Sequence, residues 1–462
     1  MKNIFKVIGI LVLALAFSCE KAEELIPTLG NEITGIRIML PNDSNTDFAV
    51  TPNENNEIYL EVDGARNTDL TKIRMSVSIP NNATVESEVP LGEYMDFSQP
   101  VTIGIIGADG EKRTYTIKLK IIPTAIKVSE LWKKTGSELG FSAHNNGAIG
   151  ISGNYIVVHD RSGFSYFNLT DGAKAGNMSW EGIDWQDLGF KMPLHMTTDD
   201  AGNIASCNAA TAVGQEIHMF WWKGVTAKPE LLFKYVLENM PGAQIGRKIY
   251  VKGDLTQHAF VYLAVSNNNT ILRWEVRDGR TVSETPKKID FDIDYTMGVQ
   301  AKVVPIELGE NTNYFINRFV NGVAQVAITY MDGVTNTPIY ESEHHIQDVF
   351  HQWLGGGHAF DYADMNGARY IFLIEQNASS WMREIFTVRA MMKDPSSINN
   401  ITSLIHTRVW NDWEKFPLDP SLGSNGNSTG EVKILVAPDG NSCTVAFLCT
   451  NSGVIVWNVE LE

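Results

Sequence analysis

Short apolar runs recur along the chain from Ala125 onward, and this repeat constrains the fold more than any other feature. Each unit holds up to four runs, separated by polar turns that often contain Asp-Gly. The second runs begin at Asn154 (NYIVVHD), Asn203 (NIASCNA), Ala259 (AFVYLAV), Asn313 (NYFINRF), Arg369 (RYIFLIE) and Cys443 (CTVAFLC). These starts lie roughly 50 to 57 residues apart, and about 74 apart before the last unit, which is typical of a β-propeller. A stack of β-sandwiches is the alternative interpretation.

The two ends of the repeat predict how such a ring would close. The last unit contains only three runs, and a lone additional run, AIKVSELWKKT, precedes the first unit. Pairing the two would remove edges that are otherwise exposed. We therefore expect residues 125–462 to form a six-bladed β-propeller with one shared blade. A seventh blade within residues 403–430 is the alternative.

A different pattern of strands occupies residues 32–122. In DFSQPVTIGIIGADGEKRTYTIKLK, from Asp96 to Lys120, apolar residues alternate on either side of Asp109-Gly110. Alternation predicts two half-buried strands, and Asp-Gly predicts a tight turn between them. The phrase resembles the closing hairpin of immunoglobulin-like or cadherin-like modules at the N-terminus of many Bacteroidetes surface proteins. The resemblance implies an Ig-like β-sandwich that acts as a spacer.

The N-terminal residues have the features of an export signal. Lys2 and Lys6 precede an apolar segment, residues 8–17, that is too short to span a bilayer. The following Ala-Phe-Ser-Cys resembles the lipobox of bacterial lipoproteins, which implies a signal peptide over residues 1–18 and lipidation of Cys19. Residues 19–31 then form a tether, whose acids resemble the export signal of Bacteroidetes surface lipoproteins. This implies a lipid anchor in the outer membrane, facing the cell exterior; an ordinary signal peptide with an incidental cysteine is the alternative.

Charge and cysteine content narrow the partners and the compartment. A formal net charge of −17 disfavours nucleic acid as a partner, because an acidic body repels phosphate backbones. A chain of 462 residues suggests two or three domains. Apart from Cys19, the chain has only Cys207, Cys443 and Cys449, which we expect to be small buried apolar residues.

Long aromatic segments connect the predicted blades and provide the candidate ligand site. These connections would lie on one face around the central channel. Their candidate ligand-binding residues are Trp185, Phe190, Tyr295, Trp353, His358, Trp410 and Trp413, with Phe416 beside them. Indole rings stack on the C–H faces of sugars, so a glycan is the expected ligand. The alternative is that these rings fill gaps between blades, since large aromatic side chains dominate β-sheet cores.

Histidines and aspartates provide weaker candidates for metal binding and catalysis. His144, His195 and His358 each lie near the start of a first run, but the tight spacing of a zinc motif is absent, so we expect no metal or cofactor. Asp290, Asp292 and Asp294 are expected on a charged outer-edge strand rather than at a calcium site. Candidate carboxylates for an enzyme are Asp199, Asp200, Asp361 and Asp364. Three of them belong to segments that resemble turns between first and second runs, which would lie opposite the aromatic loops.

The whole chain resembles Bacteroidetes surface lipoproteins of unknown function that join an Ig-like module to a propeller-like domain. We expect a non-catalytic surface protein that binds glycan for nutrient capture. The alternatives are a polysaccharide-degrading propeller enzyme, either glycosidase or lyase, and a protein-interaction component of an outer-membrane complex. Outer-membrane transport proteins are further expected partners.

Overall fold

The computed structural model describes most of the chain, in two compact units. The described ranges are 30–64, 67–123, 126–185, 192–291, 297–317, 328–341, 359–376, 383–394, 397–407, 419–423 and 429–461. The units are Met1–Ile122 and Pro123–Glu462. Strands dominate both, so the predicted all-β fold class is confirmed. Within these ranges no helix is long and apolar enough to cross a membrane.

The first unit contains two four-stranded antiparallel sheets. One has the order β2 (Asn45–Ala49), β1 (Gly35–Met39), β4 (Ile73–Ser78), β6 (Tyr94–Met95). The other has the order β3 (Glu57–Gly64), β8 (Lys112–Pro123), β7 (Val101–Ile106), β5 (Thr84–Ser87). Alternate residues of β3, namely Ile58, Leu60 and Val62, are buried while their neighbours are more exposed, as expected of a sheet with one covered face.

The hairpin predicted from the Asp-Gly turn is confirmed. Strands β7 and β8 pair antiparallel from Val101↔Ile117 to Ile106↔Lys112. Gly110 adopts φ +83°, which favours glycine, and the Asp109 carboxylate accepts a hydrogen bond from the next-but-one backbone N–H at 2.9 Å.

The second unit contains six further antiparallel sheets in the part of the chain that the structure describes. The first two are β10 (Ile149–Ser152), β11 (Tyr155–Val158), β12 (Ser165–Asn168), β13 (Lys174–Asn177), and β14 (His195–Thr198), β15 (Ile204–Cys207), β16 (Glu216–Trp222), β17 (Glu230–Val236). The third is β18 (Ile249–Asp254), β19 (His258–Ala264), β20 (Thr270–Arg277), with β21 (Arg280–Thr281) and β22 (Lys287–Asp290) both paired to β20.

The remaining three sheets complete this unit. The fourth and fifth are β23 (Val303–Pro305), β24 (Tyr314–Asn317), β25 (Ile328–Met331), β26 (Pro338–Glu341), and β27 (Ala359–Met365), β28 (Ala368–Gln376), β29 (Arg383–Asp394), β30 (Ser397–Thr407). The sixth is β31 (Gly430–Val436), β32 (Ser442–Cys449), β33 (Gly453–Leu461), β9 (Ile126–Thr135). Because residues 403–407 belong to β30, this part of the segment considered for a seventh blade belongs to the fifth sheet.

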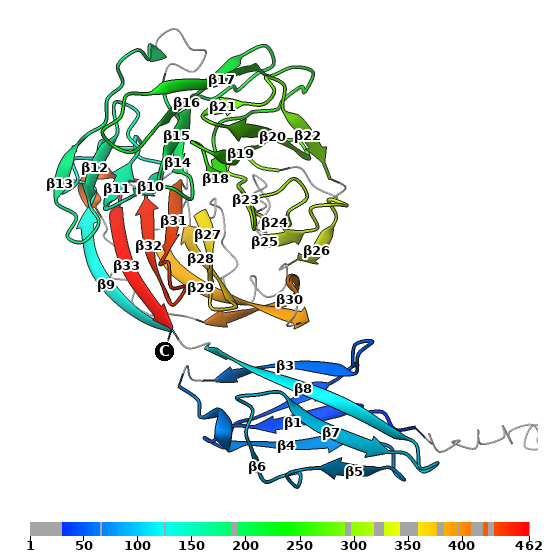
Figure 1. The fold of residues 1–462 in the computed structure, drawn as a ribbon. Helices are drawn as coiled ribbons and strands as arrows, with labels where there is room; N and C mark the ends of the chain where they lie inside the picture. The colour runs from blue at the N-terminus through cyan, green and yellow to red at the C-terminus, as the bar shows by residue number, and fades with distance from the viewer. Residues whose placement is uncertain are drawn as a thin grey trace, which may run out of the picture. The chain divides into compact units, whose positions relative to one another are not determined.

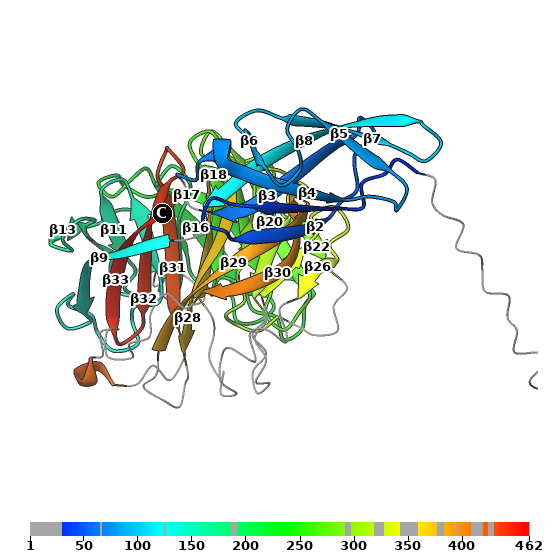
Figure 2. The same ribbon diagram turned by 90° about the horizontal axis from the view of Figure 1, so that it is seen from below.

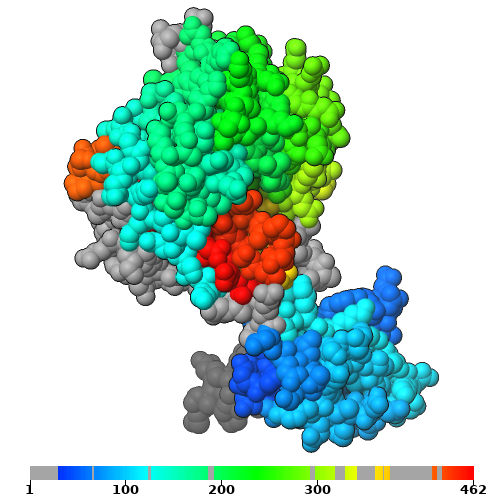
Figure 3. Space-filling model, turned by 60° about the vertical axis from the view of Figure 1, so that its left-hand side comes forward, coloured from blue at the N-terminus to red at the C-terminus, as the bar shows by residue number. Residues whose placement is uncertain are grey.

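The predicted pairing between the two ends of the repeat is confirmed. Strand β9 runs antiparallel to β33 from Gly453↔Thr135 to Leu461↔Ile126, and Figures 1 and 2 both show the two strands side by side. Figure 3 shows the red C-terminal residues beside cyan residues from the start of this unit. Trp132 of β9 is buried, and its indole N–H donates to the Leu169 carbonyl at 2.8 Å. The sixth sheet is therefore built from residues more than three hundred positions apart.

The six sheets follow one another around a centre, and the first strand of each lies nearest the middle (Figure 1). Contacts link β10 to β14, β14 to β18, β18 to β23, and β31 to both β27 and β10. Every residue of β10, β14 and β23 is buried, so these strands lack the alternation of a half-exposed strand. Polar residues on such strands therefore lie inside the ring.

Cys207, Cys443 and Cys449 of this unit are buried, as predicted. Burial raises the pKa of the Cys443 thiol to about 12 and also raises the pKa of Cys207. Both thiols are therefore protonated at neutral pH and behave as small apolar residues.

Candidate functional site

Charged side chains gather where the first strands meet. Lys248, directly before β18, and Tyr250 and Lys252 within β18 are two residues apart, as are Glu431 and Lys433 along β31. Side chains spaced by two lie on the same face of a strand, and here that face is the one toward the other first strands. The short apolar strands thus place a polar cluster at the centre of the ring.

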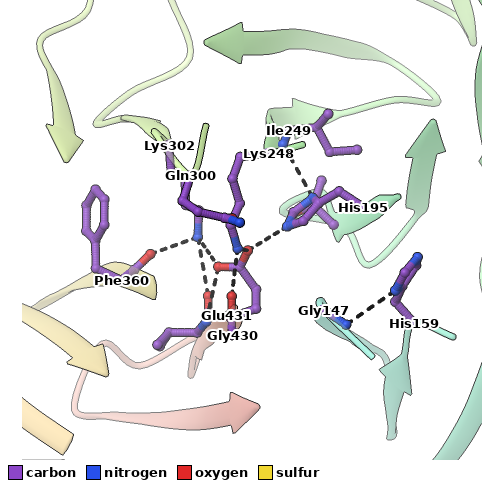
Figure 4. A network of polar contacts seen from close by, with 12 residues as sticks. Gly147, His159, His195, Lys248, Ile249, Gln300, Lys302, Phe360, Gly430 and Glu431 are labelled. Atoms are coloured by element: carbon purple, nitrogen blue, oxygen red, sulfur yellow. Dashed lines mark hydrogen bonds and ion pairs between the residues drawn. The ribbon is translucent and has the colours of Figure 1, made fainter. Parts of the chain in front are cut away.

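Glu431 is the hub of this cluster (Figure 4). Its carboxylate accepts hydrogen bonds from His195 Nε2 at 2.6 Å, Lys248 Nζ at 2.8 Å and Lys302 Nζ at 2.7 Å. All four side chains are almost entirely buried. Burial opposes ionisation of Glu431, but the two lysines outweigh it and hold the pKa of this carboxyl well below its usual range.

Both lysines of the hub are fully engaged. Lys248 Nζ also donates to the Gly430 carbonyl at 2.6 Å, and Lys302 Nζ donates to the Phe360 carbonyl at 2.7 Å (Figure 4). These bonds connect the third, fourth, fifth and sixth sheets through side chains. A buried charge with such partners avoids most of the penalty of desolvation.

His195 is neutral in this network. Its Nδ1 accepts from the Ile249 backbone N–H at 3.3 Å, so the proton resides on Nε2, which donates to Glu431. Burial, aided by Lys248, lowers the pKa of His195 to about 4. His144 lies elsewhere: its backbone N–H donates to the side chain of Asn451 at 2.7 Å. No group of three or more metal-ligating side chains occurs among the described residues, which exclude His358.

A cavity of about 320 Å³ lies toward the C-terminal ends of the first strands, beyond the Glu431 cluster. Its charged lining consists of Asp199, Asp200, Lys252, Asp361, Asp364 and Lys433. The structure therefore brings together all four candidate carboxylates, from the second and fifth sheets. As predicted, Asp199 and Asp200 lie in the turn between the first two strands of a sheet, and Asp364 lies beside such a turn, at the end of β27.

Three of these carboxylates have clear structural partners. Asp199 accepts from the backbone N–H groups of Leu255 and Asn203, each at 2.7 Å, and burial raises its pKa. Asp200 pairs with Lys252 at 3.3 Å. Asp364 forms a two-pronged ion pair with Arg369, at 2.6 and 2.7 Å.

The other two charged groups of this lining are less completely engaged. Asp361 accepts hydrogen bonds from the Tyr250 hydroxyl at 3.2 Å and the Tyr362 backbone N–H at 3.0 Å, both through Oδ1. Lys433 Nζ lies 4.8 Å from the centre of the Tyr250 ring. Among the described residues, none offers it a hydrogen-bond acceptor or an ion pair.

A second cavity, of about 440 Å³, lies against the first sheet. Its lining includes Phe141, Asn146, Asp160, Ser162, Asn177 and Trp180. These residues come from the end of β13 and from connections β9–β10, β11–β12 and β13–β14. Connections that enter the first strands lie at the face where the sequence predicts the aromatic loops. We call this space the loop-face cavity, and we call the cavity of about 320 Å³ described above, which Lys433 lines, the channel cavity.

Trp185 lies close to the loop-face cavity but does not line it. Its ring packs edge-on against Trp180 at 5.4 Å and Phe220 at 5.4 Å, and the side chain is 6% exposed. It belongs to an apolar cluster that joins the first and second sheets. This buried position agrees with the alternative interpretation, in which Trp185 fills a gap between sheets. A role of Trp185 in ligand binding stays a prediction.

The other predicted ligand residues lie outside the described residues. They are Phe190, Tyr295, Trp353, His358, Trp410, Trp413 and Phe416, together with the lipidation residue Cys19 and the strand residues Asp292 and Asp294. Asp290 is described, and it is exposed at the end of β22.

Residues 131–460 match the family described as "Domain of unknown function (DUF8500)". The chain belongs to this family. The DUF8500 match runs from within β9 to within β33, so it contains all six sheets of the second unit. No functionally curated protein matches the chain.

The comparison with solved structures gives one match with a TM-score above 0.5 among those reported below, and that match shows a similar fold. A DUF4623 family protein from Bacteroides eggerthii has a TM-score of 0.52 at 13% identity, over 94% of this chain and 99% of its own. Kuenenia stuttgartiensis hydrazine synthase has a TM-score of 0.38 at 10% identity, over 67% of this chain and 78% of its own. An AofleA mutant from Arthrobotrys oligospora has a TM-score of 0.41 at 9% identity, over 72% and 85%.

The DUF8500 domain holds several site residues that the sequence patterns missed. Lys248, Lys302, Glu431 and Lys433 do not belong to any motif, and the alternation KIYVKGD also fits a half-exposed surface strand. The available signal was the charge itself. KIYVKGD and the run that holds Glu431 and Lys433 both belong to first strands, which the propeller interpretation places at the centre of the ring.

Proposed function

We propose that this protein is a surface lipoprotein, anchored through Cys19, whose DUF8500 domain is a six-bladed β-propeller that binds glycan for nutrient capture. Six sheets around a centre, with the first strand of each innermost, support the propeller (Figure 1). The β9–β33 pairing supports closure with one shared blade. The first unit is proposed as an Ig-like spacer, which its two four-stranded sheets support.

The loop-face cavity is the observation that carries glycan binding. It combines an indole ring, Trp180, with hydroxyl, amide and carboxylate side chains in one concave space. A sugar presents C–H faces that stack on an indole and hydroxyls that exchange hydrogen bonds with such groups. One bound sugar ring can therefore contact both the indole and the polar side chains.

The polar side of this cavity is preorganised. Asp160 Oδ1 accepts from the Ser162 backbone N–H at 2.8 Å, and Asn177 Oδ1 accepts from the Ser165 hydroxyl at 2.9 Å. Asn146 is buried, and its amide donates to the His159 carbonyl at 3.0 Å. Side chains held in this way lose little further freedom when a ligand binds.

A polysaccharide-cleaving enzyme is the second candidate, favoured by the convergence of four carboxylates in the channel cavity. Glycoside hydrolysis requires one carboxyl group as acid and a second as base or nucleophile on either side of the bond. Asp200 and Asp364 are held in ion pairs, and Asp199 is held by backbone N–H groups. Among the described residues, Asp200 Oδ1 and Asp361 Oδ2 have no donor, and Asp200 is already paired with Lys252 through its other oxygen, so a binding function is preferred.

The test is a glycan-array screen with the full-length protein, followed by calorimetry with the best ligand. Trp180→Ala should weaken binding about tenfold, because stacking on an aromatic ring contributes on the order of 1 kcal/mol beyond buried area. Tyr94→Ala is the matched control, since Tyr94 is a 56% exposed aromatic residue of the first unit. Equal losses in both variants, or no glycan bound by the wild type, would contradict the proposal.

A further inference from the structure

The described residues of the second unit include three buried lysines, and they differ in their partners. Lys248 Nζ has two oxygen acceptors, from Gly430 and Glu431. Lys302 Nζ also has strong acceptors, from Phe360 and Glu431. Lys433 has no acceptor among the described residues, although it is only 5% exposed. The same channel thus satisfies two ammonium groups and leaves the third without an oxygen partner.

The contacts of Lys433 do not replace such a partner. Its Nζ lies over the Tyr250 ring, an interaction that contributes less than a charge-assisted hydrogen bond to a carboxylate. Burying an ammonium group without an acceptor is costly. Burial lowers the pKa of Lys433; Asp361 and Asp200 oppose this effect, while Lys302 and Lys252 reinforce it. The unsatisfied group lines the channel cavity, where a ligand can reach it.

Asp361 provides a second open position beside Lys433. The residue is 2% exposed and also lines the channel cavity. Both of its hydrogen bonds use Oδ1, from the Tyr250 hydroxyl and the Tyr362 N–H. Among the described residues, none donates to Oδ2. This oxygen can therefore accept a hydrogen bond from a ligand hydroxyl.

We propose that the channel cavity binds a small hydroxy-carboxylate, with the ligand carboxylate on Lys433 and a neighbouring hydroxyl on Asp361. The ligand carboxylate would serve Lys433 as Glu431 serves the other two lysines. Asp200 and Asp364 do not compete for Lys433, because each has its own cationic partner.

This site is independent of the proposed glycan site. The channel cavity is lined by the turns that follow first strands, whereas the loop-face cavity is lined by connections that precede them. The hydroxy-carboxylate has two sources with the same chemistry: a sugar acid such as a uronate, or a simple hydroxy acid. Binding experiments can separate the two.

The first experiment measures binding of glucuronate, glycerate and glucose to the full-length protein by calorimetry. Glucuronate or glycerate should bind, and glucose should bind at least about tenfold more weakly, because it lacks the charge that Lys433 requires. Preference for glucuronate would assign the site to sugar acids, and preference for glycerate to simple hydroxy acids. Absence of carboxylate binding, or glucose binding equal to glucuronate binding, would overturn the proposal.

The second experiment compares Lys433→Met with Lys302→Met. Lys433→Met should weaken carboxylate binding at least about tenfold while leaving the melting temperature of the unliganded protein unchanged or higher, because it removes a buried charge without an acceptor. Lys302→Met should lower the melting temperature, because Glu431 then loses a cation. Lys433→Gln repeats the comparison with a polar side chain. A lowered melting temperature with unchanged carboxylate affinity in both Lys433 variants would make Lys433 structural and overturn the proposal.

Discussion

At the scale of single residues, burial decides the protonation state of His159. His159 is 1% exposed, and its Nδ1 accepts from the Gly147 N–H at 3.4 Å (Figure 4). Its Nε2 lies 3.3 Å from the Pro193 carbonyl oxygen. Burial lowers the pKa of His159 to about 3, against 6.5 in an unfolded chain. Below pH 6.5 the unfolded state therefore binds a proton that the native state does not.

This difference predicts acid sensitivity with a defined sign. The stability that His159 contributes is complete above pH 6.5 and is lost as the pH falls toward 3, by about 1.4 kcal/mol per unit at most. His159→Gln should therefore flatten the dependence of the unfolding free energy on pH between about 6.5 and 4. Chemical denaturation of both proteins across this range measures the slopes. Equal slopes would show that His159 becomes protonated in the native state.

At the scale of elements, Gly453 is the tightest point of the β33–β9 pairing. Its φ is +144°, and a Cβ atom there would collide with the Lys134 carbonyl oxygen. Residue 453 pairs with Thr135 at the end of the ladder that closes the sixth sheet. Only glycine allows the two backbones to approach this closely.

Gly453→Ala should therefore destabilise the second unit, by about 1 to 3 kcal/mol, as overpacking typically does. Gly309→Ala is the control, because a Cβ at Gly309 would meet no atom within 4 Å. Thermal unfolding followed by tryptophan fluorescence compares the two variants. If Gly453→Ala unfolds at the wild-type temperature, the ladder end is too loosely packed to matter for closure.

The strands themselves could be predicted from sequence, and the central cluster could not. Apolar runs such as AIKVSELWKKT can be recognised from the local sequence. The last unit has three runs where the others have up to four, so its open edge was the expected partner of β9. Lys302 and Glu431 instead meet across 129 positions, and each is an ordinary charged residue locally. Their role arises from the arrangement of the sheets, which brings residues of five sheets, the second to the sixth, to one point. Local patterns carry no information about that encounter.

At the scale of the whole molecule, two cavities of different chemistry lie at opposite ends of the same first strands. The loop-face cavity is lined by an indole, amides, hydroxyls and the Asp160 carboxylate, whereas six of the fourteen residues that line the channel cavity are charged. Loss of glycan binding in Trp180→Ala need not affect carboxylate binding, and Lys433→Met need not affect glycan binding. Independent losses in these two variants would show that the domain holds two sites.

The proposed surface role further requires that the chain stay attached to a membrane. The proposed attachment is through acyl chains on Cys19, the cysteine that ends Ala-Phe-Ser-Cys. Each buried CH₂ of such chains contributes about 0.8 kcal/mol, and more than one chain is needed for a durable anchor. Cys19→Ala should therefore move the protein from washed membranes to the soluble fraction, as immunoblots of the two fractions would measure. Ser18→Ala keeps the cysteine and should stay with the membrane. Retention of Cys19→Ala in the washed membranes would contradict lipid anchoring and with it the proposed location.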